Sequence, residues 1–380
     1  MKTIIRTLIL FLNIIIPKNK RFICFRSAFQ YPDNIQAVLD ALIKSGKDKK
    51  YKLICIGNGF DNYHQNNIVK VKDKTVKAML YFFISKYVVW DVGIFYSVPA
   101  IKSQISLNLW HGTSLKKIGF YEEEEKPYRT STYAIAYSPL FAEKISHAFD
   151  IPLHDVLVTG EPRNDYFAVQ AADEILLKCN IPVGKDYRYV IWMPTFRQSK
   201  NHNVNNGKKY EFGIPLLNSD NIDSLDKCAA ANKVIIILKW HGSQILPKQL
   251  NRDKYSNLVF LTNDQLVACG IPFYSLVSRC HALITDYSSI YVNYMVLDRP
   301  ICFAYDDFEE YVKDRGFMFD NIDEIMPGFK ARSFDDILRF VEDTAKGEDR
   351  FKKIRHAKAS LLNTYVDFNN GKRVIDALKL

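Results

Sequence analysis

The chain has 380 residues, of which 48% are hydrophobic and 25% are charged, and this composition excludes a disordered or fibrous protein. At roughly 150 residues per domain, the length predicts two domains. The 52 lysines and arginines outnumber the 42 acidic residues, which favours a polyanionic partner: nucleic acid, an anionic lipid surface or a phosphate-bearing substrate.

The amino-terminal segment, residues 1–20, is apolar between Ile4 and Ile16 and carries basic residues on both sides. It is shorter than the about 20 apolar residues that a membrane-spanning helix needs. The residues from Pro17 onward lack the small-residue cleavage site of a signal peptide. Two interpretations remain, a buried first helix and a shallow membrane-surface anchor, and the flanking charge favours the anchor.

Residues 21–180 are expected to form a first α/β domain, because short apolar runs alternate with amphipathic stretches as in parallel βαβ units. The clearest helix is Asp33–Ser45, which has an acidic start and Gly46 just beyond its end. Buried strands are expected at Tyr51–Ile56, Tyr87–Trp90, Ile105–Trp110, Tyr133–Ala136 and Val156–Thr159.

Polar turn residues at Ile181–Asp186 mark a boundary, so residues 181–380 are expected to form a second domain of the same kind. Residues 198–222 show little periodicity and are expected to form a long loop near the site. Helices are expected at Phe334–Ala345 and Phe351–Leu362. The expected strands of this domain are Tyr189–Met193, Val234–Lys239, Asn257–Leu261, Ala282–Thr285 and Pro300–Phe303.

The seven cysteines are odd in number, widely spaced and mostly placed in apolar runs. This pattern favours reduced core thiols in a cytosolic protein over a disulfide framework or a Cys-x-x-Cys metal site. The histidines lack ligand spacing such as His-x-x-x-His, and Glu122–Glu125 is typical of a solvated acidic loop. We therefore assign no cofactor and no metal centre, although a requirement for Mg²⁺ stays open.

Two histidines, His111 and His241, each follow an apolar run that ends in tryptophan, about 130 residues apart. In a parallel α/β sheet, the residue that leaves the carboxyl end of a strand lies in the crevice where ligands bind. We therefore expect the two imidazoles to lie on opposite walls of one cleft between the two domains.

The segment Trp110–Lys117 combines groups that suit an anion. Gly112 allows close approach of the backbone, Thr113 offers a hydroxyl and Lys116 supplies countercharge. A histidine at position 111 is suited to take a proton from an alcohol, because its free pKa lies near working pH. The structural alternative is a strand-end turn whose histidine caps a backbone group, and the phosphate-suited neighbours weigh against it.

A second segment, Thr285–Ile290, places hydroxyls and a carboxylate between a strand and a helical run. Ser288 or Ser289 can cap that helix, whose amino-terminal end favours anions. A plain N-cap without a ligand is the structural alternative.

Two further strand ends offer arginines, Arg163 and Arg197, that can clamp phosphate or instead pair with a carboxylate. The candidate residues for donor and phosphate binding are Lys239, Thr195, Arg197, Thr285, Asp286, Ser288 and Ser289. The candidate acceptor-binding or cleft-lining residues are Gly112, Thr113, Lys116, Arg163, Asn164 and Asp165.

Taken together, these segments resemble the CDP-glycerol glycerophosphotransferase family, whose enzymes prime and extend teichoic acids and related capsular polymers. The resemblance rests on ordered motifs at Trp110–Gly119, Gly160–Asp165, Pro194–Arg197, Lys239–His241 and Thr285–Ser289, and it continues through Leu297–Pro300 and Tyr305–Gly316.

The resemblance implies a GT-B-like fold of two Rossmann-like domains, an acceptor half at residues 21–180 and a CDP-alcohol donor half at residues 181–380. It implies transfer of glycerol phosphate, or a related polyol phosphate, from the CDP-alcohol to a lipid-linked or oligosaccharide acceptor, with release of CMP. It also implies peripheral association with the cytoplasmic face of the cell membrane. His111 and His241 match the functional pair of the family. No basic-aromatic pattern of a nucleic-acid platform is present.

Four positions depart from the family pattern. Glu161 replaces a frequent aromatic, Gln198 an acid, Gly242 a proline, and Phe329 the last proline of a Pro-Gly-Pro run. The identities of the polyol and of the acceptor therefore stay open, although the short amino-terminal region favours a primase over a polymerase. The alternatives are a GT-B glycosyltransferase that uses a nucleotide sugar and a catalytically silent membrane-bound scaffold, against which the intact motifs argue.

Overall fold

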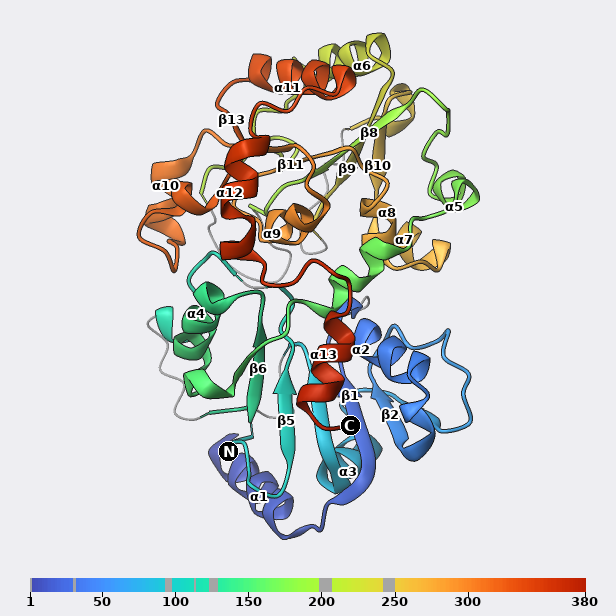
Figure 1. Ribbon diagram of the computed structural model, residues 1–380, viewed down its shortest axis with the longest axis vertical. Coiled ribbons are helices and arrows are strands. Elements are labelled where there is room, and N and C mark those ends of the chain that lie inside the picture. The colour runs from blue at the N-terminus through green and yellow to red at the C-terminus, as the bar shows by residue number, and fades with distance from the viewer. Residues whose placement is uncertain are drawn as a thin grey trace. The chain divides into compact units, whose positions relative to one another are not determined.

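The computed structural model describes residues 2–29, 32–92, 98–112, 114–122, 129–197, 207–241 and 250–380. These residues form two compact α/β units, each built on its own parallel sheet (Figure 1). Unit 1 consists of Met1–Thr113, Ile118–Tyr166 and Leu361–Leu380, and unit 2 consists of Ser114–Lys117 and Phe167–Ser360. The prediction of an α/β fold with two parallel sheets is confirmed.

The bounds of the units differ from the predicted ranges of 21–180 and 181–380. The chain leaves unit 1 after Tyr166, before the polar turn that we took as the boundary, and residues 361–380 return to unit 1. Residues 114–117 belong to unit 2, where Lys116 forms a β-bridge with Phe317. These exchanges depend on tertiary contacts, which is why no local composition signal marks them.

The sheet of unit 1 has, within the described residues, seven parallel strands in the order β3-β2-β1-β4-β5-β6-β7. The strands are β1 (Asn19–Arg26), β2 (Lys52–Ile56), β3 (Ile68–Val71), β4 (Ser85–Trp90), β5 (Ile105–Asn108), β6 (Tyr133–Ala136) and β7 (Val156–Val158). The order reverses between β1 and β4, which is the switch point where open α/β sheets bind ligands.

Helices cover both faces of this sheet, because side chains along a strand alternate between the faces. Phe25 of β1 packs in one core cluster with residues of α2 (Asp33–Lys44) and α13 (Asn370–Ala377). Its neighbour Cys24 packs in the opposite cluster with residues of α1 (Lys2–Ile15) and α3 (Val76–Ile84). The remaining helix of unit 1 is α4 (Pro139–Phe149).

Helix α1 is buried on one side only. Ile9 and Asn13 are buried, and Asn13 donates a hydrogen bond to Gln104 at 3.3 Å. The exposed apolar residues of α1 are Ile4, Ile5, Leu8, Phe11, Ile14 and Ile15. No helix among the described residues combines the length and the apolar character that crossing a bilayer requires.

The sheet of unit 2 has six parallel strands among the described residues, in the order β10-β9-β8-β11-β12-β13. The strands are β8 (Arg188–Met193), β9 (Val234–Lys239), β10 (Leu258–Leu261), β11 (Ala282–Thr285), β12 (Ile301–Ala304) and β13 (Phe329–Ala331). The helices are α5 (Asp173–Lys178), α6 (Ile222–Ala231), α7 (Asn263–Cys269), α8 (Phe273–Val277), α9 (Ile290–Tyr294), α10 (Phe308–Asp314), α11 (Phe334–Lys346) and α12 (Lys352–Leu362). The expected strands and helices all form, and the sequence analysis missed β1, β3 and β13.

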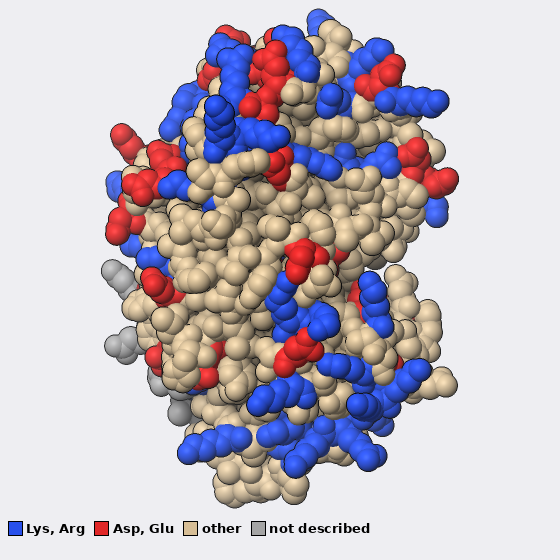
Figure 2. Space-filling view, in the orientation of Figure 1, with Lys and Arg blue, Asp and Glu red and all other residues tan. Residues whose placement is uncertain are grey.

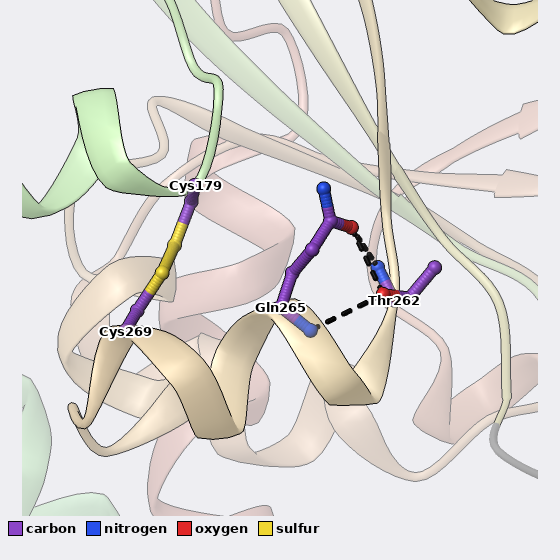
Figure 3. Close-up of a disulfide and its surroundings, with 4 residues drawn as sticks. All are labelled: Cys179, Thr262, Gln265 and Cys269. Atoms are coloured by element: carbon purple, nitrogen blue, oxygen red, sulfur yellow. Dashed lines mark hydrogen bonds between the residues drawn. A yellow bond between two sulfur atoms is a disulfide. The ribbon is translucent and has the colours of Figure 1, made fainter.

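One disulfide corrects the prediction that the cysteines are all reduced. Cys179, which follows α5, is bonded to Cys269, the last residue of α7, with 6.5 Å between their Cα atoms (Figure 3). A capping box between Thr262 and Gln265 fixes the other end of α7. The cysteines lie 90 residues apart in sequence, so only the approach of two helix ends reveals the pair.

Candidate active site

Three predicted segments of unit 2 meet at one edge of its sheet. They follow β8, β9 and β11, which are neighbours in the order β9-β8-β11 and run parallel, so their carboxyl ends lie together. The Thr195 backbone N–H donates to Asp286 Oδ1 at 2.8 Å. The ring of Phe196 lies 4.8 Å from the ring of His241, centroid to centroid. The prediction that these segments gather is therefore confirmed for unit 2.

Arg197, a predicted phosphate ligand, is paired with two carboxylates. Its guanidinium is completely buried and forms ion pairs with Asp286 at 3.0 Å and Asp307 at 3.2 Å. The rings of Tyr287 and Tyr311 lie 5.6 and 5.1 Å from it. Burial alone would lower the pKa of Arg197, but the two carboxylates raise it above the ordinary value. These ion pairs fix Arg197 within the loop after β8, and its role in phosphate binding stays a prediction.

Thr285 and Asp286 are also fully buried, and their predicted role in donor binding is not tested by this burial. The Thr285 hydroxyl donates to the Met193 carbonyl at 2.7 Å, so it joins β11 to β8. Asp286 accepts a hydrogen bond from the Thr195 N–H and forms an ion pair with Arg197, so it also joins the end of β11 to the segment after β8. The sequence could not distinguish a strand-end side chain that faces a ligand from one that faces the neighbouring strand.

The two serines after β11 do not cap a helix with their side chains. Ser289 is the N-cap of α9, but its side chain makes no capping hydrogen bond, and α9 has only five residues. The dipole of so short a helix is small. Ser288 and Ser289 are half-buried at the edge of the sheet, so their hydroxyls stay candidate ligands without a helix-end anion site.

His241 lies in a cluster of positive charge with Lys239 and Lys116. Loss of hydration and the two neighbouring ammonium groups lower the pKa of His241 to about 4. Burial lowers the pKa of Lys239 to about 8, and its ammonium donates to Asn263 Oδ1 at 2.7 Å. With this pKa the His241 ring is neutral at pH 7.

Lys116 brings part of the first histidine segment into unit 2. Burial lowers its pKa to about 7; Asp286 raises it, whereas Arg197 and Arg315 lower it further. Its ammonium lies 5.8 Å from the centre of the Phe196 ring. Lys116, Lys239 and His241 are three basic groups whose charged forms are disfavoured, so a bound anion would favour their protonation.

The strand end that carries His111 has an unusual backbone. Trp110 has a φ of 50°, which non-glycine residues rarely adopt, and Gly112 has a φ of 113°. Asn108 Oδ1 accepts a hydrogen bond from the Trp110 N–H at 2.8 Å, and Asn34 Nδ2 donates to the Trp110 carbonyl at 3.3 Å. The exposed His111 ring packs against Trp110 and against Phe29, whose ring centroid is 5.4 Å away.

Arg163 is a buried residue that contacts the backbone of this segment. Its Nη1 donates to the His111 carbonyl at 3.3 Å and to Asp33 Oδ2 at 3.4 Å. Its Nη2 contacts Glu161 Oε2 at 3.4 Å, and Asn34 Nδ2 donates to Glu161 Oε1 at 2.9 Å. Arg163 therefore positions the His111 backbone, and its predicted part in acceptor binding stays a prediction. Sequence reasoning missed the contacts of Asn34 and Glu161 in this network.

Asp165 and Asn164 are structural as well. Asp165 accepts hydrogen bonds from the backbone N–H groups of Asn370 and Gly371, both at 2.8 Å, and thereby caps α13. Asn164 is buried, and its N–H donates to the Glu161 carbonyl at 2.9 Å. Thr113, the remaining predicted ligand, lies outside the described residues, as do Gln198 and Gly242.

Comparison with known proteins decides the family. The family model described as CDP-Glycerol:Poly(glycerophosphate) glycerophosphotransferase matches residues 8–380. The chain belongs to this family. It is therefore a CDP-alcohol phosphotransferase, as the motifs predicted.

Two curated proteins that are similar to this chain are teichoic acid enzymes. A teichoic acid poly(glycerol phosphate) polymerase of Bacillus spizizenii is 26% identical over 353 residues, which cover 87% of this chain and 85% of the relative. A teichoic acid glycerol-phosphate transferase of Staphylococcus aureus is 27% identical over 356 residues, with coverages of 86% and 85%. The solved wall teichoic acid polymerase TagF covers 100% of this chain and 93% of its own, with a TM-score of 0.75 at 19% identity, and shows the GT-B-like fold.

Proposed function

We propose that this glycerophosphotransferase transfers glycerol phosphate from CDP-glycerol to a hydroxyl of a membrane-linked teichoic acid acceptor and releases CMP. The observation that carries the site assignment is the cationic cluster of Lys116, Lys239 and neutral His241. A diphosphate bound among these groups would supply the negative charge that they lack.

The proposed reaction is an in-line displacement at the β-phosphorus of CDP-glycerol. His111 accepts the proton of the acceptor hydroxyl, whose oxygen forms the new bond to phosphorus. The bond from that phosphorus to the bridging oxygen breaks, and CMP leaves with the bonding electrons. Lys116, Lys239 and His241 would neutralise the charge that grows on the leaving phosphate.

His111 suits the role of base by its setting in unit 1. The left-handed conformation of Trp110 presents the exposed imidazole, and the buried contacts of Arg163 and Asn34 to the carbonyls of residues 111 and 110 fix the backbone. A base held in one geometry loses less conformational entropy when the acceptor binds.

The polyol is a separate question, because the relatives include ribitol enzymes. A teichoic acid ribitol-phosphate primase of Bacillus spizizenii is 26% identical over 298 residues, which cover 74% of this chain and 71% of that relative. This identity is close to the 27% of the S. aureus glycerol-phosphate transferase. We favour glycerol because the family model names it, and a donor panel tests the choice.

The donor panel also separates a phosphotransferase from a nucleotide-sugar glycosyltransferase. The full chain is incubated with CDP-glycerol, CDP-ribitol or a nucleotide sugar, together with a lipid-linked teichoic acid primer. CMP release and acceptor labelling with CDP-glycerol are expected. Release of a nucleoside diphosphate from a nucleotide sugar, with no CMP from either CDP-alcohol, would overturn the proposal.

We also propose that α1 attaches unit 1 to the anionic cytoplasmic surface of the membrane. Basic residues lie at or just before the starts of the parallel strands, which share one edge of the sheet: Lys18, Lys20, Arg21, Lys52, Lys86 and Lys102. Helix α1 is held at this edge, since Lys18 Nζ donates both to the carbonyl of Asn13 in α1 at 2.6 Å and to the Phe83 carbonyl at 2.5 Å. In Figure 2, a band of basic side chains borders the apolar tip where Figure 1 shows α1.

Vesicle binding tests this attachment. Leu8→Glu and Phe11→Glu place carboxylates on the exposed apolar face and should weaken binding to phosphatidylglycerol vesicles, whereas Leu153→Glu, at an exposed apolar residue elsewhere in unit 1, should not. Neutral phosphatidylcholine vesicles should bind the wild type less well. Equal binding by the wild type and the two α1 variants would contradict the proposal.

A further inference from the structure

A second group of cations lies at the opposite edge of the unit 2 sheet. Arg188 begins β8, His281 precedes β11, and Arg299 lies just before β12, and these strands are neighbours. The six residues of β8 separate this edge from the proposed donor site by about 20 Å, at about 3.3 Å per residue. The residues line a cavity of about 290 Å³, together with residues at the end of α11 and the start of α12.

The carboxylates that line this cavity are already paired with other cations. Asp298 Oδ1 contacts Arg355 at 2.8 Å, and Asp298 Oδ2 contacts His356. Asp349 Oδ2 contacts the same Arg355 guanidinium at 2.7 Å. Two carboxylates that share the one Arg355 guanidinium leave a single negative charge, which is less than the combined charge of Arg188, Arg299 and Lys352.

Two of those cations have no counterion. Within the part of the chain that the structure describes, neither the Arg188 guanidinium nor the Lys352 ammonium forms a side-chain hydrogen bond or an ion pair. Lys352 is exposed and is the first residue of α12, so the positive end of an eleven-residue helix adds to its charge. Arg299 is partly engaged, since its Nη1 donates to the carbonyls of Ser278 and Cys280 at 2.6 and 2.5 Å.

Neutral donors complete the cavity. His281 Nδ1 accepts a hydrogen bond from the Tyr189 N–H at 3.0 Å, which leaves the hydrogen of the neutral ring on Nε2. Burial and then the charges of Arg188, Arg299 and Arg279 lower the pKa of His281 to about 4, so the ring stays neutral. The buried Thr344 hydroxyl, which also lines the cavity, has no hydrogen-bond partner among the described residues.

We propose that this cavity binds the phosphate group of a phosphate ester, at a site separate from the donor site. Unpaired guanidinium and ammonium groups beside hydroxyl and imidazole donors match a phosphate anion. The choice of phosphate over other anions rests on the proposed function, because both the donor and the polymer of that reaction carry phosphate. Figure 2 shows basic side chains gathered around the start of α12 and β11.

The size of the cavity limits the ligand. Small-molecule sites usually measure about 300–1,000 Å³, so a cavity of about 290 Å³ holds one phosphate with a glycerol-sized substituent and excludes a whole CDP-glycerol. Two molecules are sources of such a phosphate group: a free phosphate monoester, and the glycerol phosphate polymer, in which the group is a phosphodiester. The second source would hold the acceptor chain away from the reacting hydroxyl.

Calorimetric titration tests the site and distinguishes the sources. The full chain, saturated with CMP so that the donor site is occupied, is titrated with inorganic phosphate, glycerol 3-phosphate or a soluble glycerol phosphate oligomer. Arg188→Gln and Lys352→Gln should weaken binding about tenfold or more. The matched control Lys353→Gln, an exposed lysine on the same helix, should leave it unchanged. Tighter binding of the oligomer than of the monoester identifies the polymer as the source, and the reverse identifies a small phosphate ester.

The outcomes for this site are separable from those for the proposed function. CMP binding is measured first, and its absence would count against the donor site alone. Release of CMP from CDP-glycerol onto a short soluble acceptor should be unchanged in Lys352→Gln. If no probe binds at millimolar concentration, or if Lys352→Gln and Lys353→Gln bind every probe as the wild type does, the proposal is overturned. Lys352 is exposed, so Lys352→Gln should fold. The comparison of Lys352→Gln with Lys353→Gln therefore tests the proposal even if Arg188→Gln fails to fold.

Discussion

The two histidine segments begin with the same residues, Trp-His-Gly after a strand, yet their surroundings differ. The backbone of His111 is held by a buried network in which Arg163 balances Asp33 and Glu161. Loss of hydration and the neighbouring ammonium groups of Lys116 and Lys239 lower the pKa of His241 to about 4. The first setting suits the positioning of a side chain, and the second suits the binding of an anion, as we propose. The same Trp-His-Gly motif therefore has two different environments, and charged residues from distant segments make the difference.

The comparison predicts its largest effect at His111. His111→Ala should lower CMP release by about 10²–10⁴-fold, since a general base contributes that much, while the dissociation constant of CDP-glycerol changes little. The matched control is His154→Ala, which removes an exposed histidine of the same unit. Near-normal turnover in His111→Ala would show that the base lies elsewhere.

The next effect is on stability in unit 2. Arg197→Met leaves Asp286 and Asp307 buried without their cation and should reduce the free energy of unfolding of unit 2 by about 3–5 kcal/mol. Arg339→Met removes an exposed ion pair with Asp336 and should cost at most about 1 kcal/mol. Urea unfolding measures both, and equal losses would contradict the structural role of Arg197.

A smaller effect on kcat is expected at Arg163. The kcat and the KM of an Arg163 variant together distinguish a positioning role from a binding role. Arg163→Met releases the His111 carbonyl and should lower kcat by up to about 10²-fold, while the KM for CDP-glycerol stays near the wild-type value. Asp165→Asn, which weakens the cap of α13, should lower stability without this split. A rise in the KM with unchanged kcat would instead support Arg163 as a ligand.

The smallest effect is a pH dependence of donor binding. The pKa of Lys116 in the free protein is about 7 and that of Lys239 about 8, and a bound diphosphate raises both because it favours the charged amines. Donor affinity should therefore be highest below pH 7 and fall as the pH rises through 7–8, as the free amines lose their protons. Lys116→Gln should weaken binding and flatten this profile, and an unchanged profile would contradict the assignment.

Much of the fold could be predicted because local patterns of apolar residues determine its strands and helices. Apolar runs such as Val234–Lys239 form strands at their expected positions, and parallel pairing then brings Thr195 and Asp286 together. The strand β1 was missed because its first half is exposed and basic, so only its last four residues show a buried pattern. Helix α13 belongs to unit 1, where Asp165 accepts a hydrogen bond from its first residue, Asn370. Nothing in the sequence indicates this contact, because Asp165 lies in a motif that we interpreted as ligand-binding.

The site was predicted at the level of segments and only partly at the level of side chains. Sequence identifies the end of a strand, but not which face its residues take, so Arg197 and Thr285 looked like ligands although both are buried. Asn263, which holds Lys239, comes from a segment with no functional pattern of its own. Asp307 lies in the Tyr305–Gly316 part of the resemblance, but nothing local marks it as the partner of Arg197. Their roles depend on charge balance in the folded core.

The most direct test of the central claim is an NMR titration of His241 with and without CDP-glycerol. In the free protein its pKa should be about 4, because loss of hydration and then the charges of Lys116 and Lys239 oppose protonation. With the donor bound, the account predicts a clear rise of this pKa, because the diphosphate favours the charged imidazole. A His241 pKa that stays the same when the donor saturates the protein would show that the diphosphate binds elsewhere.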